Sequence, residues 1–198
     1  MKEPLRFSPD ILDGVNKETN SLLQFRLATE ADVEVLVPMV NRAYMYENEG
    51  ETAFKQRSEL RTNNDKMREA LHDGAVIVAT APQTGEIFGC VQYKEIDASD
   101  GSGSDQRTNA YFGMLTVDPA FRGRGYGRRL LNAAEEIGKV RGKHTMEIQV
   151  VNHSAYLLDL YGRYGYQVFG HISWFATFLT KPSHFVLMSK PLNPVNRA

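Results

Sequence analysis

One short run of residues constrains this chain more than any other part of its sequence: Arg122-Gly123-Arg124-Gly125-Tyr126-Gly127. An apolar stretch, Tyr111 to Val117, precedes the run, and apolar residues at helical spacing follow it from Tyr126 to Val140. We therefore expect a strand, a glycine-rich loop and the start of a helix, in that order. Such an order exposes backbone N–H groups at the positive end of a helix, and its glycines permit turns that other residues avoid. The run thus predicts a site for a ligand that carries a phosphate or pyrophosphate group.

Two segments of the sequence resemble the signatures of one known family. The segment from Leu115 to Gly127 is similar to the acetyl-CoA-binding signature of the GNAT superfamily of N-acetyltransferases, with Arg122, Gly125 and Gly127 at its three fixed positions. The segment from Leu160 to Tyr166 resembles the second motif of that family, Leu-Tyr-x-x-x-Gly-Phe/Tyr. The two motifs stand in the order of the family and at a similar distance, which makes the resemblance specific.

The resemblance implies an α/β (α+β) architecture, the GNAT fold. That fold is a mixed, mostly antiparallel twisted sheet of about six or seven strands with splayed central strands, flanked by about four helices. The strands expected to splay are Ala110 to Val117 and Thr145 to Val151, with pantetheine in the gap between them. We expect a single acetyltransferase domain at residues 23–192, a flexible tail at residues 1–22 and a C-terminal tail at residues 193–198.

Local patterns predict several helix ends and one loop. Thr29 with Asp32 three residues later indicates a helix start, and Asn63 or Asn64 is expected to cap a second helix. Ser154 is expected to cap a third helix, which ends at Gly165. The stretch from 97 to 109 is rich in serine and glycine, and is expected to be a flexible loop.

Composition excludes several other classes of protein. The chain has 23 basic and 24 acidic residues, so no nucleic-acid partner is indicated. No apolar run approaches the roughly 18 residues that a membrane span needs. Cys90 is the single cysteine and lies in an apolar strand-like run, which favours a buried structural thiol, and the five histidines lack ligand spacing, so no metal is expected. We expect an intracellular, cytoplasmic protein, although the sequence does not distinguish cytosol from nucleus.

By the resemblance, acetyl-CoA is the co-substrate. The backbone of the strand before the loop would pair with pantetheine, and the loop N–H groups would hold the pyrophosphate. The predicted contacts are Leu115, Thr116, Val117, Arg122, Gly123, Arg124, Gly125, Tyr126, Gly127 and Arg128. The family often adds an asparagine at the position of Ser154. Either Ser154 or Asn152 would therefore contact pantetheine, or each would only cap a helix.

The same resemblance assigns the general acid to Tyr161, which would protonate the departing thiolate of CoA. A phenol with an ordinary pKa near 10 suits that step. The general base is less defined, because the family uses a glutamate or ordered waters. Glu95 and Glu147 are the candidate bases, and a role on a solvated face is the alternative for both.

The predicted function is direct transfer of the acetyl group of acetyl-CoA to a primary amine of a small molecule. The alternatives are a lysine or N-terminal protein acetyltransferase and a non-catalytic acetyl-CoA-binding protein. An RNA-binding arginine–glycine segment is disfavoured, because the run occurs once, between a strand and a helix. Residues 41–70 and 171–184 are expected to build the acceptor site. Dimers are common among relatives, so a homodimer stays an open alternative.

Overall fold

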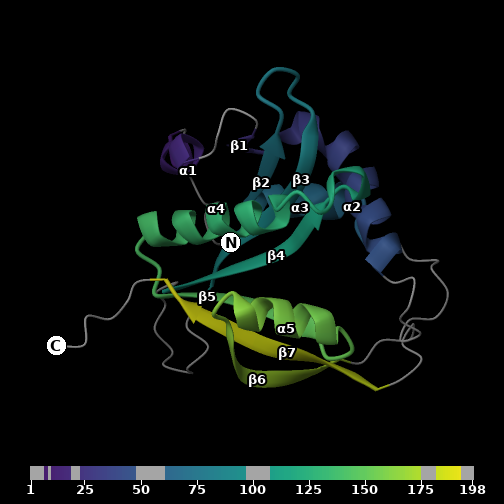
Figure 1. The fold of residues 1–198 in the computed structure, drawn as a ribbon, viewed down its shortest axis with the longest axis vertical. Coiled ribbons are helices and arrows are strands. Elements are labelled where there is room, and N and C mark those ends of the chain that lie inside the picture. Colours follow the sequence, from purple (N-terminus) through teal and green to yellow (C-terminus); the bar gives the residue numbers. More distant parts are fainter. Residues whose placement is uncertain are drawn as a thin grey trace.

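The computed structural model describes residues 7–8, 10–18, 23–47, 61–96, 108–174 and 182–192. Its elements (Figure 1) are α1 (Asp13–Glu18), β1 (Gln24–Leu27), η1 (Glu30–Asp32), α2 (Val33–Glu47), α3 (Asn64–His72), β2 (Ala75–Thr80), β3 (Ile87–Ile96), β4 (Asn109–Val117), η2 (Pro119–Phe121), α4 (Tyr126–Val140), β5 (Thr145–Val151), α5 (Ala155–Arg163), β6 (Gln167–Trp174) and β7 (Ser183–Pro191). From β1 onward, the order of strands and longer helices is the predicted one. The tail at 193–198 and most of the loop predicted at 97–109 lie outside the described residues.

The strands form one seven-stranded sheet in the order β1-β2-β3-β4-β5-β7-β6. Every neighbouring pair is antiparallel except β4 and β5, which are parallel. The mixed, mostly antiparallel sheet that the sequence predicts is therefore confirmed.

The parallel pair β4 and β5 stays together for only two residue pairs, Ala110 with Met146 and Tyr111 with Glu147. Beyond Tyr111, β4 continues beside β3 as far as Val117, while β5 pairs along its whole length with β7. The edge of β4 from 112 to 117 consequently has no strand partner among the described residues. This is the splay that the sequence predicts, and we call it the split.

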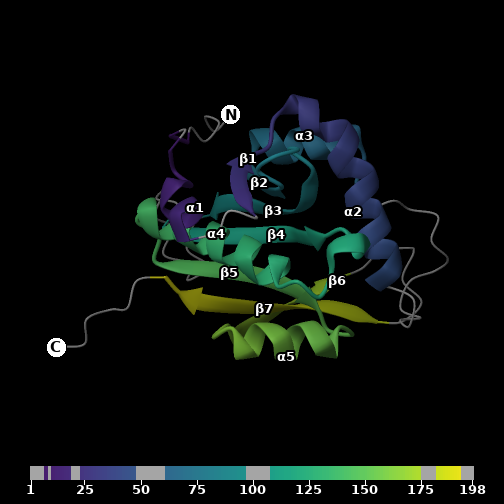
Figure 2. The ribbon, with the colours of Figure 1, turned by 45° about the horizontal axis from the view of Figure 1, so that its top comes forward.

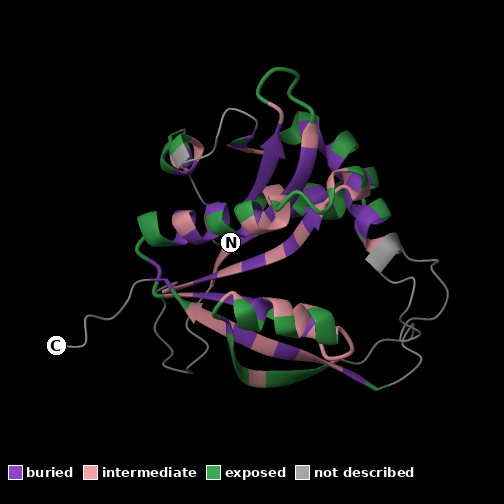
Figure 3. Cartoon of the chain, in the orientation of Figure 1, coloured by how far each residue is buried: buried purple, intermediate pink, exposed green. Residues whose placement is uncertain are grey.

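Helices cover both faces of the first half of the sheet. All six residues of β2 are buried, as Figure 3 shows, which is the pattern of a strand covered on both sides. Ile77 and Ala79 pack in the core that α4 covers, and Val76 and Val78 pack in the core that α2 and α3 cover. Figure 2 shows α5 beside β7, at the opposite end of the molecule from α3.

A bulge in β4 determines which of its side chains face α4. Two residues of β4 lie opposite Val91, and the second half of β4 begins at Met114, which has a positive φ of 51°. Ala110 and Phe112 belong to the core under α4, whereas Met114 belongs to the core under α2. After the bulge, Leu115 and Val117 pack toward the α4 side again.

The N-terminal region differs from the loose tail that the sequence predicts. Residues 13–18 form α1, and the side chains of Leu12 and Val15 are buried in the core under α4. The side-chain amide of Asn16 donates to the Phe25 carbonyl at 2.9 Å and accepts from the Phe25 N–H at 2.7 Å. The prediction was wrong for this part, because buried apolar side chains and the Asn16 amide hold this short helix against the core and β1. The outer limits of the domain stay predictions.

Two of the predicted helix starts are confirmed. The Asp32 carboxylate accepts from the Thr29 N–H at 2.8 Å, and the Arg26 guanidinium donates to both of its oxygens at 2.8 Å. The Asn63 side chain accepts from the Lys66 N–H at 2.9 Å at the start of α3. No helix in the described part of the chain has the length and apolar character needed to cross a bilayer.

The Asp32 carboxylate generates a stability prediction. The Asp32→Asn variant should lower the free energy of unfolding by about 1 kcal/mol at pH 7, because it weakens the bonds to Thr29 and Arg26. The hydrogen bond from Arg26 is the main cause that holds the pKa of Asp32 below its ordinary value. The stabilisation is therefore present at neutral pH and should disappear as the pH falls below about 4 and through that lowered pKa.

Urea unfolding of both proteins at several pH values would measure this difference. Glu69→Gln, at an exposed position of α3, is the control and should change stability by at most about 0.5 kcal/mol. A difference between Asp32→Asn and the parent protein that stays constant down to pH 2.5 would contradict the role of the carboxylate.

Candidate active site

A cavity of about 220 Å³ lies where the unpaired edge of β4 meets the start of α4 and the face of α5. We call it the loop cavity. Its lining residues are Leu115, Val117, Phe121, Arg122, Gly123, Gly125, Tyr126, Gly127, Arg128, Tyr156, Leu160 and Tyr164. Of the ten contacts predicted from Leu115 to Arg128, the cavity contains all except Thr116 and Arg124.

At two positions, the loop before α4 has a backbone conformation that strongly favours glycine. Gly123 and Gly125 have φ values of 75° and 76°. A Cβ atom at either position would meet no protein atom within 4 Å, so conformation rather than crowding requires glycine there. Gly125 is the N-cap of α4, and no side chain caps this helix end. The first N–H groups of α4 are therefore available to an anion.

The four arginines of this region have different roles. Arg128 lines the loop cavity, and its guanidinium lies over the Tyr164 ring at 4.0 Å. Its Nη1 atom is buried and has no hydrogen-bond partner among the described residues. Arg122, in contrast, donates to the Ala43 carbonyl of α2 at 3.0 Å. Arg124 lies over the Phe121 ring at 5.5 Å, and Arg129 is exposed.

The side of the loop that faces α2 is fastened by a second contact. The Asp118 carboxylate accepts from Arg42 of α2 at 2.6 Å and from the Ala120 N–H at 3.0 Å. Burial would raise the pKa of Asp118, but the hydrogen bonds from Arg42 and Ala120 outweigh it, so this pKa lies below its ordinary value. The end of α2 and the loop are thus joined by the Arg42 ion pair and by the Arg122 hydrogen bond.

Three further predicted contact residues, Thr116, Asn152 and Ser154, do not line the loop cavity. The bulge turns Thr116 to the other face, where its hydroxyl donates to the Met114 carbonyl at 3.0 Å. The Asn152 side chain accepts from the His184 N–H at 3.0 Å and so joins β5 to β7. Ser154 is at the N-cap position of α5, but its hydroxyl makes no capping hydrogen bond. Neither Asn152 nor Ser154 lines the cavity.

Tyr161 packs against β4 at the point where the split begins. It is only 5% exposed, and its ring packs edge-to-face against Phe112 and Tyr166 with centroid distances of 5.6 and 6.0 Å. Phe112 is the first residue of β4 beyond the last pair with β5. The tyrosines that line the loop cavity are Tyr126, Tyr156 and Tyr164.

Glu95 does not fit the role of general base. Its buried carboxylate pairs with Arg141 and with Lys143, the latter at 2.7 Å, near the C-terminal end of α4. Burial would raise the pKa of Glu95, but the bonds from these two cations outweigh it and hold the pKa below its ordinary value. Glu95 lines neither cavity described here. A carboxylate that two cations stabilise in its charged form is a poor base, so this prediction is corrected.

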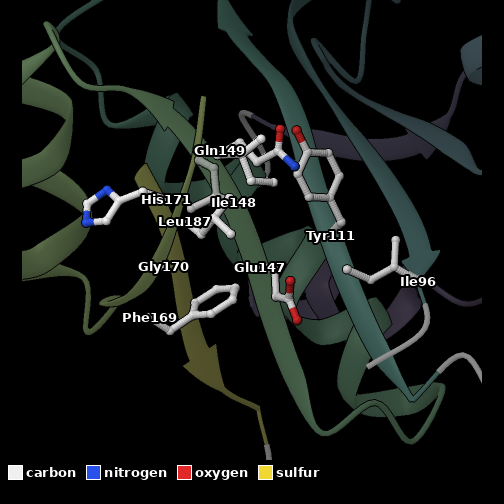
Figure 4. A pocket seen from close by; sticks show the side chains of 10 residues that line it. Ile96, Tyr111, Glu147, Ile148, Gln149, Phe169, Gly170, His171 and Leu187 are labelled. Carbon is white, nitrogen blue, oxygen red and sulfur yellow. The ribbon is translucent and has the colours of Figure 1, made fainter. Parts of the chain in front are cut away.

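A second cavity, of about 560 Å³, opens on the opposite face of the sheet (Figure 4). We call it the far-face cavity. Its lining residues are Ile96, Tyr111, Glu147, Ile148, Gln149, Phe169, Gly170, His171, Ile172 and Leu187. The side chains of Tyr111, Glu147 and Gln149 alternate with residues that pack under α4 and α5, so they point to the other face.

Sequence reasoning missed most of the far-face cavity. Of the segment 171–184 expected at the acceptor site, His171 and Ile172 line it, and residues 175–181 lie outside the described part. Of the segment 41–70, none of the described residues, 41–47 and 61–70, lines it. Strand alternation in 109–117 and 145–151 is the signal that could have identified Tyr111 and Gln149. Glu147, a predicted candidate base, is 8% exposed and accepts from the Asn109 amide at 2.7 Å.

Among the described residues, no group of three or more histidine, cysteine, aspartate or glutamate side chains is placed to hold a metal ion. The Cys90 thiol is buried, and burial raises its pKa to about 12, so it is uncharged at neutral pH.

Known structures with this fold include two with stated ligands or activities. The structure of yncA from Salmonella typhimurium, with its cofactor acetyl-CoA, matches with a TM-score of 0.62 and 20% identity, over 88% of this chain and 95% of that one. The ribosomal-protein-S18-alanine N-acetyltransferase from Escherichia coli matches with a TM-score of 0.65 and 14% identity, over 89% and 97% of the two chains. At these identities the similarity establishes the fold, and the GNAT architecture predicted from the sequence is confirmed.

Sequence comparison identifies the family. An uncharacterized N-acetyltransferase from Methanocaldococcus jannaschii is 36% identical over 66 residues, which are 33% of this chain and 29% of that relative, so the match spans under a third of its length. The sequence model of the acetyltransferase (GNAT) family matches residues 41–166, from α2 to the end of the second motif. The chain therefore belongs to the acetyltransferase (GNAT) family.

Proposed function

We propose that this protein transfers the acetyl group of acetyl-CoA directly to the primary amine of a small molecule. The observation that carries the proposal is Arg128, whose buried Nη1 has no hydrogen-bond partner among the described residues and lies in the loop cavity. A buried guanidinium nitrogen without a partner is costly, and a phosphate oxygen is the partner that it fits best. The uncapped N-terminus of α4 lies in the same cavity, so two independent anion-binding features meet there.

The pyrophosphate of acetyl-CoA would bind at the first turn of α4. Gly123 and Gly125 leave open space beside the helix N-terminus, and Gly127 would bring a Cβ no nearer than 3.6 Å to Val117. The ring of Tyr164 holds the Arg128 guanidinium in place before a ligand arrives. The side chain of Arg122 serves the loop instead, because it is bonded to Ala43.

The pantetheine arm would follow the unpaired edge of β4. Leu115 and Val117 line the loop cavity on that edge, and their backbone can pair with the amides of an extended ligand, as an added strand would. This path leads from the loop toward Phe112, where β4 leaves β5 and where Tyr161 packs.

The reaction would take place at the split. The nitrogen lone pair of the amine forms a bond to the acetyl carbon, and the bond from that carbon to sulfur breaks. We propose that Tyr161 gives its hydroxyl proton to the departing sulfur and regains one from water, while the nitrogen releases a proton to water. Acetyl-CoA and the amine would approach the split from opposite faces of the sheet, and this supplies the proximity that direct transfer needs.

A small acceptor is favoured by the volume and the lining of the far-face cavity. Its volume of about 560 Å³ and its apolar walls are typical of small-molecule sites. A protein N-terminus or lysine acceptor is the alternative, and the alanine N-acetyltransferase from Escherichia coli shares the fold.

The cofactor site predicts an effect on affinity. Arg128→Ala should weaken acetyl-CoA binding about 10- to 100-fold, because it removes a charged hydrogen-bond donor. Arg129→Ala is a matched control, since Arg129 has the same charge, is the next residue along and is exposed. Isothermal titration calorimetry with acetyl-CoA would measure both. Equal effects of the two variants would mean that acetyl-CoA affinity depends only on the overall positive charge of this region. That result would contradict a specific contact with Arg128.

The proposed acid predicts an effect on turnover. Tyr161→Phe should lower kcat by about 10²-fold or more with an unchanged dissociation constant for acetyl-CoA, because it removes a proton donor and leaves the ring in place. The comparison variant is Tyr166→Phe. In the parent protein the Tyr166 hydroxyl donates to buried Glu135 at 3.0 Å, so its removal should lower stability rather than kcat. Thiol release under saturating acetyl-CoA would measure turnover. If Tyr161→Phe retained parental kcat, the assignment of Tyr161 would be wrong.

A further inference from the structure

Tyr111 occupies the space that a side chain at position 113 would fill. A Cβ atom built on Gly113 would lie 3.0 Å from the Tyr111 Cε1 atom and 3.1 Å from its hydroxyl oxygen. The Tyr111 ring therefore lies along β4, over Gly113. Since Gly113 is two residues beyond the last pair with β5, the hydroxyl is placed at the open part of the split.

The groups around this hydroxyl are polar, and the charge of the Arg61 guanidinium acts on it. Figure 4 shows the Gln149 amide beside the Tyr111 hydroxyl, at the end of the far-face cavity away from Glu147. Burial is the main cause that raises the pKa of Tyr111, so the hydroxyl is protonated at neutral pH and can both donate and accept a hydrogen bond.

The rest of the far-face cavity offers mainly apolar surface. Its walls are built by Ile96, Phe169, Ile172 and Leu187, and Figure 4 shows Phe169 and Ile96 on either side of Glu147. Phe169 and Ile172 are 45% and 48% exposed, so their apolar surface is accessible to a ligand. The ring of His171 points away from this surface in Figure 4. Glu147 turns toward Asn109, four residues before Gly113 along β4.

We propose that the far-face cavity binds a primary amine with an aromatic or branched-aliphatic body, and that Tyr111 contacts the reacting nitrogen. This inference rests on the proposed acetyl transfer. The nitrogen lies between the Tyr111 hydroxyl and the Gln149 amide, at the split, and the body of the acceptor packs on Phe169, Ile172 and Leu187. The hydroxyl oxygen accepts a hydrogen bond from an N–H of the amine and directs the lone pair of the nitrogen toward β4.

The apolar walls discriminate against two other classes of amine. A polyamine would place further ammonium groups against Phe169 and Ile172, and burying a charge on such a surface is unfavourable. A peptide would place its backbone amides there, where these side chains offer no hydrogen bonds. Glu147 is the one acidic residue among the described lining residues, at the far end of the cavity.

Three probe amines test the class of acceptor: 2-phenylethylamine, spermidine and an alanyl tripeptide amide. Thiol release with saturating acetyl-CoA would give kcat/KM for each. We expect 2-phenylethylamine to exceed the other two by about 10-fold or more. If spermidine or the tripeptide is the best acceptor, the apolar class is wrong while acetyl transfer stands. If acetyl-CoA neither raises the melting temperature of the protein nor supports any thiol release, the proposed function fails and the acceptor assignment fails with it.

Single variants test the two parts of the site. Tyr111→Phe keeps the ring over Gly113 and removes only the hydroxyl, so kcat for 2-phenylethylamine should fall about 10-fold with acetyl-CoA affinity and melting temperature unchanged. Ile172→Ala should raise KM for this amine about 10-fold, with kcat unchanged. Val168→Ala is the matched control, because Val168 is 53% exposed on the same strand but does not line the cavity. An unchanged kcat in Tyr111→Phe would overturn the contact between Tyr111 and the reacting nitrogen. Equal KM values in Ile172→Ala and Val168→Ala would overturn the packing of the acceptor on Ile172.

Discussion

The parting of β4 from β5 after Tyr111 is the feature on which the rest of this structure depends. It leaves the edge of β4 from 112 to 117 without a strand partner, and unpaired backbone groups are unfavourable unless water or a ligand satisfies them. The two strands are held apart because each is anchored elsewhere. β4 pairs with β3 and carries helices on both faces, whereas β5 pairs along its whole length with β7. The open edge is thus fixed by packing that lies outside it.

The bulge at Met114 gives the two sides of the split different chemistry. Leu115 and Val117 face the loop cavity, where Arg128 and the glycine-rich start of α4 suit an anionic ligand. Tyr111, before the bulge, faces the far-face cavity, where a few polar groups and mainly apolar walls suit an amine with an apolar body. Both cavities take lining residues from β4, Tyr111 in the far-face cavity and Leu115 with Val117 in the loop cavity. Contacts from Arg42 and Arg122 join α2 to the loop, so the loop is positioned from both faces of the sheet.

Features fixed by neighbouring residues could be predicted from the sequence, and features that depend on distant packing could not. The order of strands, the caps at Asp32 and Asn63 and the glycine loop follow from short-range rules, and they are confirmed. The side chain of Thr116 points away from the loop cavity because a bulge, which the sequence does not signal, shifts the alternation of β4. Glu95 was misassigned because its partners come from the far end of α4. The Tyr111 ring over Gly113 was missed because alternation gives a face of the sheet but not the direction in which a ring lies along it.

Amide hydrogen exchange with and without acetyl-CoA is the most direct test of the central claim, that the unpaired edge of β4 and the start of α4 form one acetyl-CoA site. The account predicts slower exchange together in two places: the backbone of residues 113–117 and the N–H groups of residues 123–128. Exchange in β7, which pairs along the whole length of β5, should stay unchanged. Protection of the helix start alone would mean that the protein binds only the phosphate part of acetyl-CoA there, and that pantetheine does not pair with β4. Protection of neither segment, in a protein that still binds acetyl-CoA, would contradict the account.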